Sequence, residues 1–146
     1  MRHPARLRVG ILAAALWWGS LTSLGCVVVP MLFLHMGTPA SAGAMAAKLF
    51  SAQAWMGIGC AMLMLLVFNQ KDEETQAASA HSAIKFIVAG LLLALLVEFG
   101  AVPRIASARA EGGSLRLWHG LGSAMLVAQW LCAGWTLWLL TPRSGR

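Results

Sequence analysis

Residues 84–102 read IKFIVAGLLLALLVEFGAV, and this apolar stretch decides the fold. A helix of roughly 20 apolar residues spans the hydrocarbon core of a bilayer, which is about 30 Å thick. Three further runs meet the same requirement, at about residues 9–36, 45–68 and 117–140. The sequence therefore predicts an all-α integral membrane protein, in which a single four-helix transmembrane bundle occupies residues 1–146.

The composition supports a lipid environment. Of the 146 residues, 59% are hydrophobic and 11% are charged, and the mean hydropathy is +0.73. An ordinary soluble domain carries about 25% charged residues. The net charge of +6 does not indicate a nucleic-acid partner, because the basic residues flank the apolar runs, where they meet lipid phosphates. Cys26, Cys60 and Cys132 each lie within an apolar run without metal-type spacing, so we expect buried, inert thiols.

The basic residues also predict the orientation. With the N-terminus inside, seven Lys and Arg residues face the cytoplasm and four face outward, which predicts that both termini are cytoplasmic. The seven are Arg2, Arg6, Arg8, Lys71, Lys85, Arg143 and Arg146, and the four are Lys48, Arg104, Arg109 and Arg116. The first run is about twice as long as the apolar core of a signal peptide, so we expect an anchor. The expected location is the cell inner (plasma) membrane, with the lipid bilayer as partner.

The connections and the packing faces can also be predicted. Residues 37–43 predict a tight turn, and residues 69–80 predict a solvated, charged loop. Residues 103–116 predict a loop whose first half forms a short interfacial helix, because proline is tolerated at a helix start. The tryptophans are expected to form interfacial belts. Small residues at four-residue spacing in the last run predict one continuous packing face, made of Gly120, Ala124, Ala128, Cys132 and Thr136.

Glu98 lies about one turn from the outer end of the third run. A charged side chain at mid-bilayer costs roughly 2.5–3.5 kcal/mol, and Gly90 and Ala94 precede Glu98 on the same helix face, so we expect the carboxylate to point into the bundle. Lys48 or Arg104 is its expected partner. Antiparallel alternation brings further polar residues to this end of the bundle, namely His35, Arg109 and His119.

Three interpretations of this polar site stay open. In a polar cap, Glu98 forms an ion pair and the histidines hydrogen-bond to the backbone. In a metal or haem site, His35 and His119 bind the metal, and the nearby methionines suit copper. In an anion site, Arg104 and Arg109 hold a small ligand, because guanidinium groups match carboxylate and phosphate.

Short motifs follow one another in a fixed order along the chain. Pro30-Met31-Leu32-Phe33 comes first, then Lys48-Leu49-Phe50, then Pro103-Arg104 with Arg109 beyond it, and finally Trp118-His119-Gly120. With these motifs the chain resembles the four-helix membrane family catalogued as domain of unknown function 4149, which is similar to transmembrane protein 205 of animals. The resemblance spans nearly the whole chain and implies a four-helix architecture without an established enzymatic activity. It marks Lys48, Phe50, Pro103, Arg104, His119 and Gly120 as motif positions, and His35 lies outside the pattern.

The predicted function is that of a multi-pass membrane protein with a polar site at the outer end, where haem or copper is a candidate cofactor. One alternative is a structural or assembly subunit that docks a membrane partner. Another is a small-solute transporter, which would need a homo-oligomer to enclose a pathway. An enzyme is the least favoured class, because the sequence has no nucleophile beside a base, no paired carboxylates and no phosphate loop.

Overall fold

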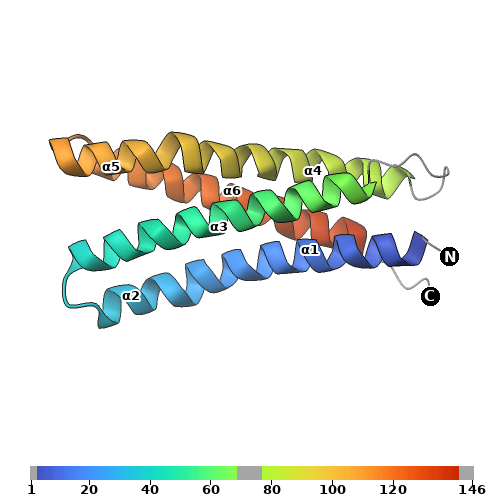
Figure 1. The fold of residues 1–146 in the computed structure, drawn as a ribbon, viewed down its shortest axis with the longest axis horizontal. Helices are drawn as coiled ribbons and strands as arrows, with labels where there is room; N and C mark the ends of the chain where they lie inside the picture. Colours follow the sequence, from blue (N-terminus) through green and yellow to red (C-terminus); the bar gives the residue numbers. More distant parts are fainter. Residues whose placement is uncertain (1–2, 69–76, 142–146) are drawn as a thin grey trace.

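Four long helical spans form one bundle of two antiparallel hairpins (Figure 1). The computed structural model describes residues 3–68 and 77–141, and the regular structure within these ranges is all helical. The first span consists of α1 (His3–Ser23), the π-helix η1 (Leu24–Val28) and α2 (Val29–His35); the second is α3 (Pro39–Phe68); the third consists of α4 (Ala77–Leu96), the π-helix η2 (Val97–Ala101) and α5 (Val102–Glu111); the fourth is α6 (Leu115–Leu140). Each span is long and apolar enough to cross a membrane. The prediction of an all-α bundle with four helical spans long and apolar enough to cross a membrane is therefore confirmed.

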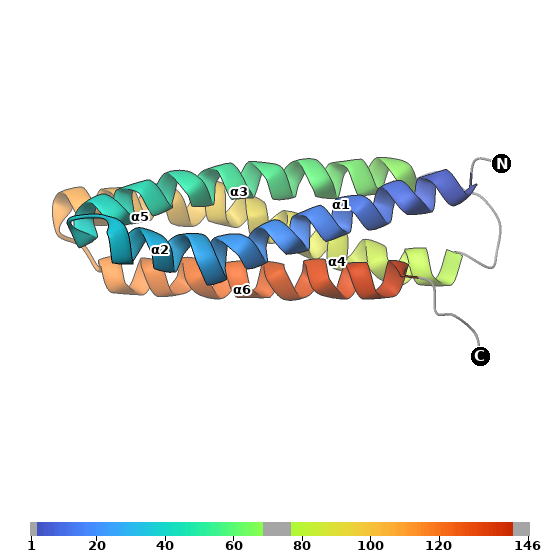
Figure 2. The ribbon, with the colours of Figure 1, turned by 90° about the horizontal axis from the view of Figure 1, so that it is seen from below.

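The bundle has two different ends (Figure 2). The turn end holds residues 36–38, between α2 and α3, and residues 112–114, between α5 and α6. The termini end holds the start of α1 and the end of α6. Residues 69–76 of the predicted charged loop lie outside the described residues, and α4 already begins at Ala77.

The second span begins at Pro39, which is six residues earlier than predicted. Thr38 caps the helix, because its Oγ1 accepts a hydrogen bond from the Ser41 N–H at 3.2 Å and its carbonyl accepts one from the Ala42 N–H at 3.1 Å. Proline suits the first helical position, where its missing N–H is not needed. Lys48 therefore lies about two and a half turns inside the helix rather than at its start.

The third span continues through Pro103 to Glu111, so the predicted helix end at residue 102 is wrong. Proline normally ends a helix, because it lacks an N–H and crowds the carbonyl four residues earlier. Here η2 provides an extra residue in the turn before it, and the Val102 N–H bonds to the Val97 carbonyl. The helix ends at Gly112, whose φ of 76° suits glycine. The predicted short helix thus exists as α5, and it continues the third span directly.

Trp17 fills the centre of the bundle. Its side chain is fully buried, so the prediction of an interfacial belt is wrong for this residue. A Cβ atom added at Gly57 would lie 2.7 Å from the Trp17 Nε1, and one added at Gly90 would overlap the Trp17 Cη2. Glycines on α3 and α4 therefore form the slot that admits the indole. By contrast, Trp55, Trp135 and Trp138 are exposed on the outside of the bundle.

The predicted small-residue row of α6 is buried only toward the C-terminal end of the helix. Gly120 and Ala124 are exposed, whereas Thr136 is fully buried. Four residues turn an α-helix by about 400°, so a strict four-residue row drifts by about 40° at each step and leaves the contact face. The buried row is Gly122, Gln129, Ala133, Thr136 and Leu140. The prediction of buried thiols is likewise wrong for Cys26, which is exposed on η1, while Cys60 is buried.

Candidate functional site

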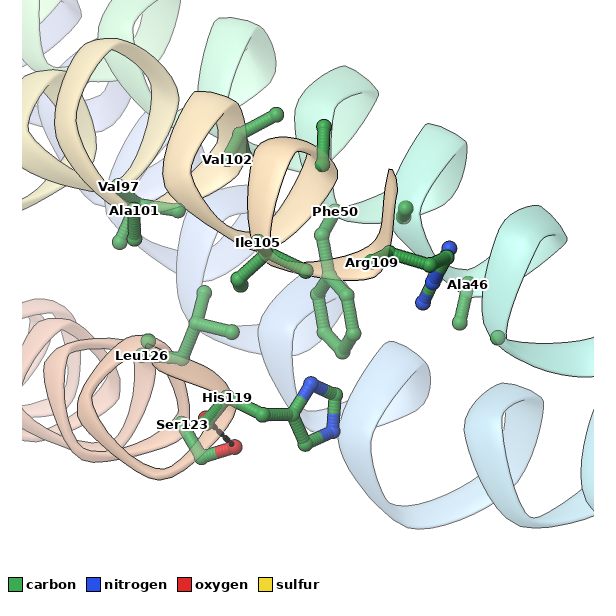
Figure 3. Close-up of a pocket in the computed structure, with 14 residues that line it drawn as sticks. Ala46, Phe50, Val97, Ala101, Val102, Ile105, Arg109, His119, Ser123 and Leu126 are labelled. Atoms are coloured by element: carbon green, nitrogen blue, oxygen red, sulfur yellow. Dashed lines mark hydrogen bonds between the residues drawn. The ribbon is translucent and has the colours of Figure 1, made fainter. Parts of the chain in front are cut away.

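A cavity of about 110 Å³ lies at the turn end, between three spans (Figure 3). Its walls are mostly apolar. The residues of α3 that line it are Gly43, Ala46, Ala47 and Phe50; those of α6 are His119, Gly122, Ser123 and Leu126; and η2 and α5 supply Val97, Ala101, Val102, Ile105, Ala106 and Arg109. Of the predicted polar-site residues, the structure thus brings together Phe50, Arg109 and His119.

The direction of each helix determines how far its lining residues lie from the turn end of the bundle. α3 and α6 both run away from the turn end, so the backbones of Gly43 and His119 lie at the rim while those of Phe50 and Leu126 lie deeper. The third span runs the opposite way and places Arg109 at the rim (Figure 3). Gly43 and Phe50 are seven positions apart, which corresponds to about 10 Å along the helix axis. The cavity consequently has a polar rim and an apolar floor.

The rim carries two exposed nitrogen donors. Arg109 fits there because Gly43 has no side chain: a Cβ atom at that position would lie 3.3 Å from the Arg109 Nη2. Within the described ranges, neither the Arg109 guanidinium nor the His119 imidazole has a hydrogen-bond or ion-pair partner. The Ser123 Oγ donates a hydrogen bond to the His119 carbonyl at 2.9 Å, so this bond involves the backbone of His119 and not its ring. Both donors are available to a ligand.

Glu98 lies beside the cavity wall, on η2. Its Oε1 accepts a hydrogen bond from the Ser51 Oγ at 2.6 Å, and its Oε2 is buried without a partner among the described residues. The predicted ion pair with Lys48 or Arg104 is therefore wrong. Lys48 is exposed, and the Arg104 guanidinium stacks over the Trp118 ring, 4.7 Å from its centroid. Trp118 competes for Arg104 because an arginine cation is attracted to an aromatic face.

Replacing Ser51 with alanine is expected to lower the free energy of unfolding by about 1–2 kcal/mol, because it leaves the Glu98 carboxyl group without a partner. Denaturation of the purified protein in mixed micelles measures the change. The control is a double-mutant cycle with Glu98→Leu, in which the Ser51→Ala cost should largely disappear. Equal costs in both backgrounds would show that the hydrogen bond does not stabilise the fold.

His35 does not join the cavity. It is exposed at the end of α2, and its Nδ1 lies 3.0 Å from the Met31 carbonyl, as the polar-cap interpretation predicted for the histidines. Across residues 3–68 and 77–141, no three His, Cys, Asp or Glu side chains lie close enough together to hold a metal ion. The cavity is also smaller than the roughly 150 Å³ that holds a benzene molecule, so it does not enclose a porphyrin. The metal and haem hypothesis stays a prediction.

A family model described as domain of unknown function (DUF4149) matches residues 12–114. The chain belongs to this family. The matched region contains the motif residues Lys48, Phe50, Pro103 and Arg104 and ends before α6, so the Trp118-His119-Gly120 motif lies outside it. No curated protein and no solved structure matches the chain. The resemblance to transmembrane protein 205 therefore stays a prediction.

Other motif positions predicted from the sequence lie outside the cavity. Pro103 is exposed near the start of α5, and Gly120 is exposed on α6. Two buried polar residues were not predicted from the sequence, Gln53 and Gln129. Both amides are buried; the Gln53 Nε2 donates to the Ser20 Oγ at 3.0 Å, and the Gln129 Nε2 donates to the Gly90 carbonyl at 3.3 Å. An amide within a long apolar run was the signal that could have identified them.

Proposed function

We propose that this protein binds a small amphipathic anion within the membrane, with the anionic group at Arg109 and His119 and the apolar part on the cavity floor. The observation that carries the proposal is the change in polarity along the cavity, from two nitrogen donors at the rim that have no partner among the described residues to Phe50 and Leu126 at the floor. An inorganic anion would leave the floor empty, and a neutral hydrocarbon would leave the rim unused.

The chemistry of the rim favours an oxyanion. A guanidinium group offers paired N–H donors that match carboxylate and phosphate geometry, and an imidazole N–H adds a third donor nearby. The apolar wall favours a hydrocarbon part, because burying apolar area contributes about 25 cal/mol per Å². A cavity of about 110 Å³ accommodates a short alkyl chain.

The expected orientation places the cavity on the outer side of the cell inner membrane. Seven Lys and Arg residues on the side of the termini against four on the side of the turns support a cytoplasmic location of both termini. The ligand would then enter from outside the cell membrane or from its outer leaflet. Free alkyl phosphates and anionic phospholipids both combine an oxyanion with a hydrocarbon part, as the proposed ligand does.

Arg109→Gln is expected to weaken the binding of butyl phosphate about tenfold, which corresponds to the lower end for a hydrogen bond to a charged group. The measurement is isothermal titration calorimetry on the full-length protein in nanodiscs of neutral lipid. Arg104→Gln is the matched control, since it also removes one positive charge from α5. The Arg104 guanidinium stacks on Trp118, and neither residue lines the cavity. The expected effect of Arg104→Gln is less than about threefold.

A second series of nanodiscs identifies the source of the ligand. If the anion comes from lipid, phosphatidic acid in the nanodisc should compete with butyl phosphate, and Arg109→Gln should relieve the competition. If the ligand is water-soluble, phosphatidic acid should have no effect. Equal losses for Arg109→Gln and Arg104→Gln, or no binding by the unmodified protein, would overturn the proposed function.

A further inference from the structure

The two hairpins repeat one structural plan. In the first span, the π-helix η1 (Leu24–Val28) is followed by Val29 and Pro30; in the third, η2 (Val97–Ala101) is followed by Val102 and Pro103, 73 positions later in each case. The same π-type hydrogen bond closes both, from the Val29 N–H to the Leu24 carbonyl and from the Val102 N–H to the Val97 carbonyl. A π-turn is rare, and its occurrence twice before a proline marks equivalent sites.

Burial follows the same repeat. With the shift of 73 positions, the buried pairs of the first and third spans are Gly10 and Ala83, Ala14 and Ile87, Trp17 and Gly90, Leu21 and Ala94, and Leu24 and Val97. With a shift of 76 positions, those of α3 and α6 are Ala46 and Gly122, Gln53 and Gln129, Gly57 and Ala133, Cys60 and Thr136, and Met64 and Leu140. The packing agrees, because α1 contacts both α3 and α6, and α4 contacts both α6 and α3. The hairpins are thus related by an approximate two-fold axis along the bundle, as in other repeated membrane folds.

The cavity lies between equivalent parts of α3 and α6, and the third span closes it on one side. All four of its α3 residues have their equivalents among its four α6 residues: Gly43 with His119, Ala46 with Gly122, Ala47 with Ser123, and Phe50 with Leu126. The repeats differ at the rim, where glycine faces histidine, and agree at the floor, where both residues are large and apolar. The two halves therefore build one cavity together, with a polar side supplied by the second hairpin.

A polar layer lies directly beneath the floor. Gln53 and Gln129, again equivalent in the repeat, follow Phe50 and Leu126 by three residues, which is about one helical turn. Both amides are buried, and the Gln129 Oε1 has no partner among the described residues. An alkyl chain that passed the floor would meet amides that it cannot hydrogen-bond, and such contact is unfavourable.

We infer that the chain is a tandem repeat of one helical hairpin and that Phe50 and Leu126, at equivalent places on the cavity floor, set the length of the apolar part of the ligand. This inference rests on the proposed function. It predicts a chain-length limit that depends on the combined size of the two side chains, irrespective of which hairpin carries the larger one.

The test measures the affinity of the full-length protein in nanodiscs for alkyl phosphates of increasing chain length. Affinity should rise about fourfold for each added methylene until the chain reaches the floor, and should then level off. Phe50→Leu should move this plateau to longer chains, and Leu126→Phe should move it to shorter chains. The double variant Phe50→Leu/Leu126→Phe should restore the original plateau, because a volume-conserving exchange across the axis leaves the floor unchanged.

Leu121→Phe is the control, since it makes the same change at an exposed site of α6 away from the cavity, and its plateau should not move. If binding depends on Arg109 but the plateau stays fixed in all floor variants, the inference is overturned and the proposed function stands. A double variant that does not recover the original plateau also overturns it, because the two positions are then not equivalent. If the unmodified protein binds no alkyl phosphate, both are overturned. Phe50→Met replaces Phe50→Leu should the latter fail to fold.

Discussion

Replacing Trp17 with alanine is expected to lower the free energy of unfolding by about 3 kcal/mol. The indole is fully buried and fills the slot between Gly57 and Gly90, so its loss leaves a void at the centre of the bundle. Lipid tails are as apolar as the bundle interior, so the cost comes from lost packing contacts and lies at the low end for buried aromatic residues. Unfolding in mixed micelles with increasing SDS, followed by circular dichroism, measures it.

Two variants serve as controls for this prediction. Trp138→Ala removes an indole that is 64% exposed and should change stability by less than about 0.5 kcal/mol. Trp17→Phe keeps most of the packing and loses no hydrogen bond, because the buried Nε1 has no partner among the described residues. It should cost about 1 kcal/mol. If Trp17→Ala and Trp138→Ala have equal effects, Trp17 does not hold the bundle together.

Gly90→Ala is expected to destabilise the protein by about 2–3 kcal/mol, although alanine is the better helix former. The added Cβ would overlap the Trp17 Cη2 and approach the Cys132 Cβ to 3.4 Å. The indole cannot move aside, because its Nε1 edge already lies against Gly57. The same denaturation experiment measures the loss of stability.

Gly59→Ala is the matched control, because a Cβ atom at Gly59 meets nothing within 4 Å. It should be neutral or should stabilise the helix by up to about 1 kcal/mol. Combining Gly90→Ala with Trp17→Phe should cost less than the sum of the single changes, since the smaller ring leaves room for the methyl group. Strict additivity in this cycle would mean that Gly90 and Trp17 are not in contact.

Some features of the fold could be predicted because they depend on local sequence. Apolar length alone predicts four spans, and the cost of a carboxylate in lipid predicts that Glu98 faces the bundle, where it bonds to Ser51. The helix boundaries at Pro39 and Pro103 were mispredicted. A tight turn was expected over residues 37–43 and a helix end at residue 102, whereas Pro39 begins α3 at its first position and Pro103 follows a π-turn within the third span.

The candidate site could be predicted only in part. Its end of the bundle, together with Arg109 and His119, follows from the antiparallel order of the spans, whereas Phe50 was expected only as a motif position of the resembled family. The absence of Lys48, Arg104 and His35 from the cavity could not be predicted, because the sequence of a helix does not give its rotation about its own axis. The same limitation hid Gln53 and Gln129, which the repeat of the two hairpins places on equivalent faces.

The sequence by itself determined that residues 84–102 and three similar runs are long and apolar enough to cross a membrane, because transfer of a helix into lipid depends on the sum of its side chains. Only the tertiary structure decided that the third run continues through a π-turn and α5 to the rim of a cavity, where it places Arg109 opposite His119. The reason is that lipid supplies no net force between helices. Helix positions in the bundle therefore depend on contacts such as Trp17 between Gly57 and Gly90, which involve residues far apart in the chain.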